Sequence, residues 1–167
     1  ILKKKSWSNL SLDEVLKSLK IKKTNIKTKH DLLKNISNYV DQTLIEKMKS
    51  LERSSTKDML FEVLMARFDI LELNRKSFIE IYKYFRVNPQ NFIKFMPTLL
   101  ESMIITAELA KYNVNGLKGT FQLKGLMIIY FITFFQWMDD KDSSLEKTMT
   151  ALDRNLDNAE KFGKLFL

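Results

Sequence analysis

Side chains able to perform covalent or metal chemistry are scarce in this sequence. The 167 residues include one histidine, His30, and no cysteine. These counts exclude thiol nucleophiles, cysteine-ligated zinc and iron–sulfur sites, disulfides and multi-histidine metal sites. Asp139, Asp140 and Asp142 form an acidic cluster, but such a cluster just before a helix is more typical of capping than of cation binding. Because no acid, base and nucleophile stand in a recognisable arrangement, we predict that the protein is not an enzyme and uses no metal or cofactor.

Positive charge is concentrated near the start of the chain. Residues 1–50 hold 12 lysines and five acidic residues, whereas residues 51–167 hold 16 basic and 15 acidic residues. A basic field focused in this way suits a polyanion, either a nucleic acid or an anionic membrane surface. The alternative is a lysine-rich composition that only keeps a short amphipathic region in solution.

Candidate DNA contacts lie in and beside the polar segment 21–27. Lysine supplies positive charge for phosphates, while threonine and asparagine side chains donate to phosphates or reach a base. The candidate DNA-binding residues are Lys22, Lys23, Thr24, Asn25, Lys27 and Lys29. The alternative for this segment is a solvated turn between two helices.

Apolar residues recur at helical spacing along the whole chain, and no alternation of period two lasts long enough for a strand. Capping boxes at Ser11–Glu14 and Ser143–Glu146 mark two helix starts, Thr28 with Asp31 marks another, and Thr56 is expected to cap a fourth helix. Helices are expected over 12–20, from Thr28, from Thr56, from Asn74 to Asn88, from Pro97, over 117–138 and over 145–162, with a separate short helical turn at 89–95. The four glycines and two prolines argue against sandwiches and barrels. We therefore predict an all-α fold.

Phenylalanine and methionine are frequent through the middle of the chain. Both side chains line adaptable apolar pockets in helical proteins. The candidate ligand-pocket residues are Phe61, Met65, Phe68, Phe78, Tyr82, Phe85, Met103 and Phe121. Helical spacing also produces an ordinary core, which is the alternative.

The early part of the chain resembles the tri-helical DNA-binding head of TetR-type bacterial regulators. A short helix, a lysine-rich turn and a Thr-Lys helix entry follow one another within about 25 residues. Ile21 matches the apolar position of the turn in that head. Thr28 and Lys29 match the Ser/Thr-Lys that opens the long connecting helix, and residues 32–33 match the apolar pair that follows.

A second group of motifs resembles the body of an alphaproteobacterial group of TetR-like proteins. The tail of the pattern is also similar to the coenzyme-Q accessory family, which shares the TetR fold, binds lipids and lacks repressor activity. The matching segments are 57–69 (KDMLFEVLMARFD), 116–119 (GLKG), 137–140 (WMDD) and 148–154 (TMTALDR). Together with the head, the resemblance covers most of residues 10–165.

The resemblance implies a helix-turn-helix head with its connecting helix over residues 1–50, and a helical ligand-binding and dimerisation body over 51–167. The segment 22–27 departs from the family, since it lacks the tyrosine and the aromatic-Phe pair of the recognition helix and is shorter by about one helical turn. A shortened segment of this kind still contacts phosphates, but it reads base edges less well. The first helix of the head is expected before Ile1.

The resemblance also implies dimerisation through the last two long helices. The helix over 121–138 is apolar on nearly every side, so it needs cover all round, and a second chain would supply it. The candidate dimer-interface residues are Met127, Tyr130, Phe134, Trp137, Met149, Leu152 and Leu156. The alternative is that both helices are fully buried within one chain.

From these features we expect a dimeric, DNA-binding TetR-like regulator that senses an apolar small molecule. The alternative is a lipid-binding accessory protein of the coenzyme-Q type that kept the fold without operator binding. The longest apolar run, 126–138, is shorter than the roughly 20 residues that span a membrane. We therefore expect no transmembrane segment and a cytoplasmic location.

Replacing Lys22, Lys23 and Lys27 together with glutamine is expected to abolish affinity for duplex DNA. Charge contacts to phosphates supply most of non-specific and much of specific DNA affinity, so removing three of them weakens binding steeply. Titration of a labelled duplex with wild-type and triple-variant protein measures the loss. Unchanged affinity would remove this segment from the DNA-binding surface.

Overall fold

The computed structural model describes residues 5–18, 20, 25–50 and 54–165, and every regular element in them is helical. The prediction of an all-α fold is therefore confirmed. The elements, in chain order, are α1 (Leu12–Ser18), α2 (Lys29–Lys47), a single 3-10 turn η1 (Met48–Ser50), α3 (Thr56–Leu73), α4 (Arg75–Val87), α5 (Pro89–Leu109), α6 (Gly116–Asp139) and α7 (Glu146–Leu165).

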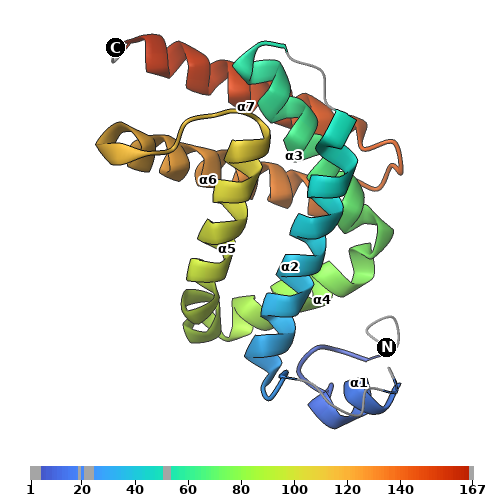
Figure 1. The fold of residues 1–167 in the computed structure, drawn as a ribbon. Helices are drawn as coiled ribbons and strands as arrows, with labels where there is room; N and C mark the ends of the chain where they lie inside the picture. The colour runs from blue at the N-terminus through green and yellow to red at the C-terminus, as the bar shows by residue number, and fades with distance from the viewer. Residues whose placement is uncertain (1–4, 19, 21–24, 51–53, 166–167) are drawn as a thin grey trace.

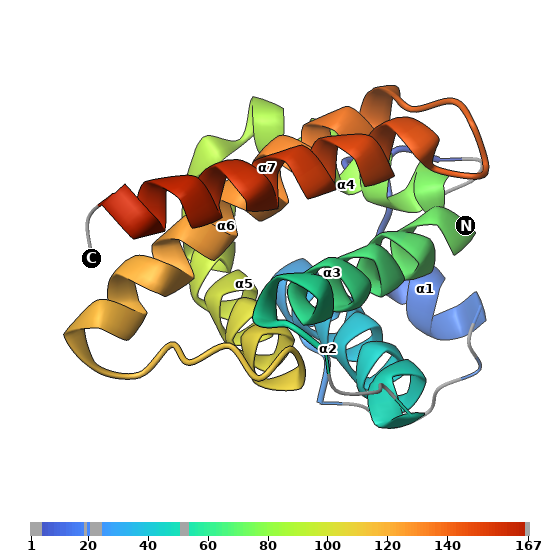
Figure 2. The same ribbon diagram turned by 90° about the horizontal axis from the view of Figure 1, so that it is seen from above.

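The helices form a bundle crossed at one end by an antiparallel pair (Figure 1). α2 packs against both α3 and α5, and α4 connects α3 to α5 at the end of the bundle nearer α1. α6 and α7 lie side by side along their length and pack across α3 and α5, as the view from above shows (Figure 2). α1 lies at the opposite end of the molecule from α7, beside the first turn of α2.

The expected capping box at Ser11 is confirmed, and the expected helix start at Thr28 also forms a capping box. The Glu14 backbone N–H donates to the Ser11 hydroxyl at 3.1 Å, and the Ser11 N–H donates to the Glu14 carboxylate at 3.2 Å. At the start of α2, the Asp31 N–H donates to the Thr28 hydroxyl at 3.1 Å while the Thr28 N–H donates to the Asp31 carboxylate at 2.9 Å. Each box satisfies backbone groups that the first helical turn leaves without partners.

Two other helix starts differ from the expectation. Ser55, one residue before Thr56, is the N-cap of α3 and accepts a hydrogen bond from the Asp58 N–H. The first turn of α7 is capped by a residue further back in the chain. The Asp140 carboxylate accepts from both the N–H and the hydroxyl of Thr148, each at 2.9 Å. Burial by itself would raise the pKa of Asp140, but these hydrogen bonds outweigh it and lower that pKa. The expected cap at Ser143 was therefore wrong, and the acidic cluster acts as a cap through Asp140.

The separate helical turn expected at 89–95 was also wrong, because α5 runs without a break from Pro89 to Leu109 and contains Pro97. Pro89 occupies the first turn, where the missing N–H has no helical partner to lose. Pro97 removes the hydrogen bond to the Ile93 carbonyl, yet its own side chain is exposed and crowds no neighbouring helix. Packing of Phe95 and Leu99 on either side of it keeps the helix continuous.

Buried apolar residues form two clusters. The larger lies among α2, α3, α5, α6 and α7 and includes Leu44, Val63, Phe68, Met103 and Trp137. We call the smaller one the head cluster; it joins the N-terminal segment and α1 to α2 and α4, and consists of Trp7, Leu10, Val15, Leu33, Ile81 and Phe85. The N-terminal end of the chain is thus packed on the bundle through a core of its own.

The carboxyl end of α6 is fixed by a basic side chain on another helix. Arg75 donates to the Trp137 and Met138 carbonyls at 2.6 and 3.0 Å, and its guanidinium lies 4.7 Å from the centre of the Trp137 ring. Glu72 accepts from both Arg75 and the Trp137 indole N–H, at 2.6 and 2.8 Å. A cation at this position satisfies the last carbonyls of the helix and complements its dipole.

Gly119→Ala is expected to destabilise the fold, because an added β-carbon would lie 2.0 Å from the Val114 carbonyl carbon. The loop before α6 would have to move, at a cost of about 1–3 kcal/mol. Gly125→Ala, in the same helix, is the matched control: its β-carbon meets nothing within 4 Å, so the change should stabilise by about 0.5–1 kcal/mol. Chemical denaturation of both variants measures the two changes, and equal effects would contradict the close approach.

Candidate functional site

A cavity of about 510 Å³ lies within the bundle, among α2, α3, α4, α5 and α6. This volume falls in the range typical of small-molecule sites, about 300–1,000 Å³. The side chains around it are mostly aromatic and aliphatic, and no acidic residue belongs to the wall. The described wall consists of Leu33, Ile36, Ser37, Val40, Arg67, Leu71, Phe78, Ile81, Tyr82, Phe85, Arg86, Pro89, Phe92, Phe95, Leu99, Tyr130, Phe131, Phe134 and Phe135.

The spacing of apolar residues on α4 and α5 explains the aromatic wall. Residues 78, 81, 82 and 85 recur at intervals of three and four, so they share one face of α4. Phe92, Phe95 and Leu99 repeat this spacing on α5. The rings of Phe85 and Phe95 stack at 5.3 Å between centroids, and Phe92 meets Phe131 of α6 edge to face at 6.0 Å.

The inner end of the cavity is polar and built around Arg67. Its Nη1 donates to the Asp41 carboxylate at 2.8 Å, and Nη2 donates to the Ser102 hydroxyl. Ser102 in turn donates to the same Asp41 oxygen at 2.5 Å, while Thr106 accepts from Nη1 at 3.3 Å. The Arg67 and Asp41 side chains are only 3% and 5% exposed. α2, α3 and α5 are therefore joined by one buried ion pair that borders the cavity.

Two further features mark this inner end. The Nε of Arg67 is buried and has no hydrogen-bond partner among the described residues. Its guanidinium also lies 5.8 Å from the centre of the Tyr130 ring. Burial raises the pKa of the Tyr130 hydroxyl, and the charge of Arg67 and a hydrogen bond from it only partly offset this, so the phenol stays protonated at neutral pH. The polar end thus presents donors rather than free charge.

The opposite end of the cavity reaches the surface. Arg86, Pro89 and Phe135, which belong to the wall, are exposed. No ion pair or hydrogen bond is recorded for the Arg86 side chain within the described part of the chain. A ligand would therefore enter beside a free positive charge and extend inward along apolar surface.

Part of the cavity wall also supports the N-terminal end of the chain. Leu33, Ile81 and Phe85 line the cavity and belong to the head cluster. Ile36, Phe78, Phe92 and Phe95 line it too and pack against that cluster. One layer of side chains thus separates the cavity from Trp7, Leu10 and Val15 of the N-terminal segment and α1.

The structure brings Phe78, Tyr82 and Phe85 together on the cavity wall, but places the other expected pocket residues elsewhere. Phe68 and Met103 are fully buried in the larger cluster, while Phe61 and Met65 are half-buried against it. Phe121 lies on the outer face of α6 and is 73% exposed. These five therefore do not line this cavity, because helical spacing does not distinguish a cavity wall from a core.

Sequence reasoning missed the polar end of the cavity. Arg67 interrupts an apolar helix face between Leu64 and Leu71, and Asp41 stands beside Val40 on the inner face of α2. One charge of each sign on inward faces is the signal that could have indicated a buried pair. Their partner Ser102 lies 61 residues from Asp41, so local spacing alone could not have joined the three.

The expected dimer-interface residues mostly pack within one chain. Trp137 and Leu152 are fully buried, Met127, Tyr130 and Leu156 nearly so, and Phe134 is half-buried on the cavity wall. Helices of the same chain cover most of the surface of these six, and of the seven residues Met149 alone is exposed, at 43%. Their role in a dimer stays a prediction. The outer face of α6 instead carries a row of exposed apolar residues, Leu117, Phe121, Ile128, Ile132 and Phe135. We call it the α6 row.

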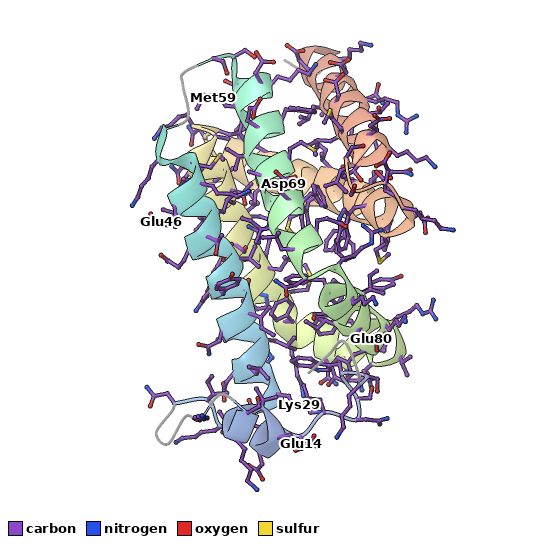
Figure 3. The ribbon with its side chains drawn as sticks, turned by 90° about the vertical axis from the view of Figure 1, so that its right-hand side faces the viewer. Glu14, Lys29, Glu46, Met59, Asp69 and Glu80 are labelled. Carbon is purple, nitrogen blue, oxygen red and sulfur yellow. The ribbon has the colours of Figure 1, made fainter. Side chains whose placement is uncertain are left out.

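The expected DNA-binding residues are only partly described. Lys22, Lys23 and Thr24 lie outside the described residues, and Asn25 and Lys27 are exposed. Lys29 is half-buried at the foot of α2, near Glu14 of α1 (Figure 3). Its ammonium donates to the Trp7 and Ser8 carbonyls at 3.0 and 3.1 Å, so it attaches the N-terminal segment to α2. Its role as a phosphate contact stays a prediction.

A scan against protein-family models and a search of curated proteins return no match for this chain. The resemblance to TetR-type regulators therefore stays a prediction. Among the described helices, α6 is long and apolar enough to cross a membrane by length and composition, with a mean hydropathy of 1.2. α5 and α7 cover the apolar residues on one face of α6. The residues of the α6 row, on the opposite face, stay exposed.

Arg67→Met is expected to destabilise the fold by about 3–5 kcal/mol, because it leaves the Asp41 carboxylate buried without its cation. Adding Asp41→Asn should recover much of that loss, since the buried charge is then gone. Urea unfolding of the wild type, the two single variants and the double variant measures the four free energies of unfolding that give the coupling between the two side chains. A double variant that loses as much as the sum of the singles would contradict a coupled buried pair.

Proposed function

We propose that the protein is a dimeric, TetR-like DNA-binding regulator whose body binds an apolar small molecule in the cavity. The observation that carries this proposal is the shared wall: Leu33, Ile81 and Phe85 contact the cavity on one side and the N-terminal end of the chain on the other. Binding of a ligand and the position of the basic head then depend on the same side chains.

The cavity supports binding better than catalysis. Its wall is aromatic and aliphatic, and the charged groups at its inner end neutralise each other. No nucleophile next to a base is present among the described wall residues, and no cluster of metal-ligating side chains occurs in the described part of the chain. A concave apolar volume with a few directed polar groups is the usual form of a small-molecule binding site.

α2 supports coupling between the cavity and the head. It begins at Lys29, whose side chain holds the N-terminal segment, and continues along the cavity through Leu33, Ile36 and Ser37. A ligand that shifts these side chains would move the start of α2 and the residues attached to it. A difference in ligand affinity between two head positions would, by linkage, change DNA affinity by the same factor.

The α6 row supports a dimer. Its five apolar side chains follow one face of a helix that α7 accompanies, and Met149 of α7 is exposed as well. Monomeric proteins rarely expose contiguous apolar surface of this kind, and a two-fold axis across α6 and α7 would cover it on both chains. The proposed interface therefore uses the outer face of the helix pair and not its buried face.

One observation favours the second candidate, a lipid-binding accessory protein of the coenzyme-Q type. Ten residues separate Ser18 at the end of α1 from Lys29 at the start of α2, and the described ones, residues 20 and 25–28, are not helical. Base readout in the major groove needs a helix or ribbon that enters it. A stoichiometric isoprenoid, recovered by organic extraction of purified protein and mass spectrometry, would favour this second function.

Ile36→Trp is expected to weaken binding of the uncharged probe N-phenyl-1-naphthylamine at least tenfold, about 1.4 kcal/mol. Ile36 is half-buried on the cavity wall, so an indole there would occupy the volume that the probe needs. Tyr39→Trp is the matched control, because Tyr39 lies one turn further along α2 but is exposed and outside the wall.

The measurement is a fluorescence titration of the wild type and both variants, with circular dichroism to establish that each is folded. The control should bind the probe as the wild type does. Equal affinities of all three proteins would place the probe outside the cavity, and no binding by the wild type would contradict the proposed ligand site.

A further inference from the structure

Both terminal nitrogens of Arg67 donate hydrogen bonds within the protein. Nη1 donates to Asp41 and Thr106, and Nη2 donates to Ser102. Nε is the one guanidinium nitrogen that is buried without a partner among the described residues, and Arg67 belongs to the cavity wall. A buried donor without an acceptor lowers the free energy of unfolding by about 1–3 kcal/mol. A ligand that supplies an acceptor at this nitrogen would therefore recover that free energy on binding.

We propose, building on the ligand site above, that the cavity binds an uncharged, mostly apolar molecule that places one carbonyl oxygen at Arg67. The carbonyl accepts a hydrogen bond from Nε–H, and the apolar remainder lies along the aromatic wall of α4 and α5. The chemical class is an aryl or alkyl ketone or ester rather than a carboxylic acid or a hydrocarbon.

The charge balance at the inner end excludes an anionic group there. The Arg67 charge is already neutralised by Asp41 at 2.8 Å, and both side chains are almost fully buried. A carboxylate brought to Nε would lose its hydration and would lie near the negative charge of Asp41. A carbonyl loses far less hydration and needs only one donor. An anionic group would instead remain at the mouth, where Arg86 is exposed.

The surroundings of Nε suit the apolar part of such a molecule. Leu71 and Leu99 line the cavity from α3 and α5, and the Tyr130 ring lies beneath the guanidinium. Further out, the stacked rings of Phe85 and Phe95 offer flat faces that aromatic or extended ligands cover. The site therefore combines one directed donor with a long apolar surface.

The test compares three probes of similar shape: 2-acetylnaphthalene, 2-isopropenylnaphthalene, in which a CH₂ group replaces the carbonyl oxygen, and 2-naphthoate. Isothermal titration of the wild-type protein at neutral pH should give a three- to tenfold preference for the ketone over the alkene, as one net hydrogen bond predicts. The naphthoate should bind more weakly than the ketone. Equal binding of ketone and alkene, or preferred binding of the naphthoate, would overturn this inference.

Two variants locate the preference. The double variant Arg67→Met, Asp41→Asn removes the guanidinium without leaving a buried carboxylate unpaired, so it should bind the ketone and the alkene equally. Arg86→Gln removes the charge at the mouth and should keep the wild-type preference. Loss of the preference in Arg86→Gln, or its persistence in the folded double variant, would overturn the assignment to Arg67.

An infrared measurement on the wild type avoids dependence on a foldable Arg67 variant. The stretch of ¹³C-labelled carbonyl in bound 2-acetylnaphthalene should move to lower frequency than in hexane, because the Nε–H bond polarises it. An unshifted band in the bound state would contradict the proposal. If neither naphthalene binds, the ligand site itself fails; if both bind equally, the site stands and only the carbonyl assignment fails.

Discussion

The buried ion pair between Arg67 and Asp41 joins the three long helices of the bundle and defines one end of the cavity. Asp41 comes from α2, Arg67 from α3, and Ser102 from α5, and each of them contacts the other two. Separating such a pair inside a protein leaves an uncompensated charge, so the three helices hold their positions together. The aromatic wall then continues from this fixed point toward the surface, and the remaining helices are arranged around it.

The cavity and the N-terminal end of the chain depend on the same layer of side chains. Leu33, Ile81 and Phe85 are buried because Trp7, Leu10 and Val15 cover them from one side. Their opposite sides face a volume that holds no protein atoms. Since protein interiors are close-packed and transmit displacement, filling that volume would change the support on which Trp7, Leu10 and Val15 rest. This shared layer is the structural basis of the coupling that we propose.

Features set by neighbours in sequence could be predicted, and features set by distant contacts could not. The capping boxes at Ser11 and Thr28 are local, since donor and acceptor lie three residues apart. Pro97 misled the prediction because tertiary packing on both sides of it keeps α5 helical. The two faces of α6 could not be told apart, because both are apolar and only the positions of α5 and α7 decide which face is buried.

The candidate site shows the same limit. Phe78, Tyr82 and Phe85 could be predicted as wall residues because they share one face of a strongly amphipathic helix. Arg67 could not, since its partners Asp41 and Ser102 are 26 and 35 residues away along the chain. The polar end, to which we assign the chemical preference of the cavity, exists only where α2, α3 and α5 meet.

The central claim, that cavity occupancy and DNA binding are coupled, is tested most directly by one binding experiment. The affinity of the protein for its own upstream DNA and for scrambled DNA is measured at two salt concentrations, with and without saturating N-phenyl-1-naphthylamine. The account predicts a preference for the upstream DNA that survives the higher salt and an affinity that changes at least fivefold when the probe is present. Binding that ignores sequence, vanishes with salt and is the same with and without the probe would contradict it.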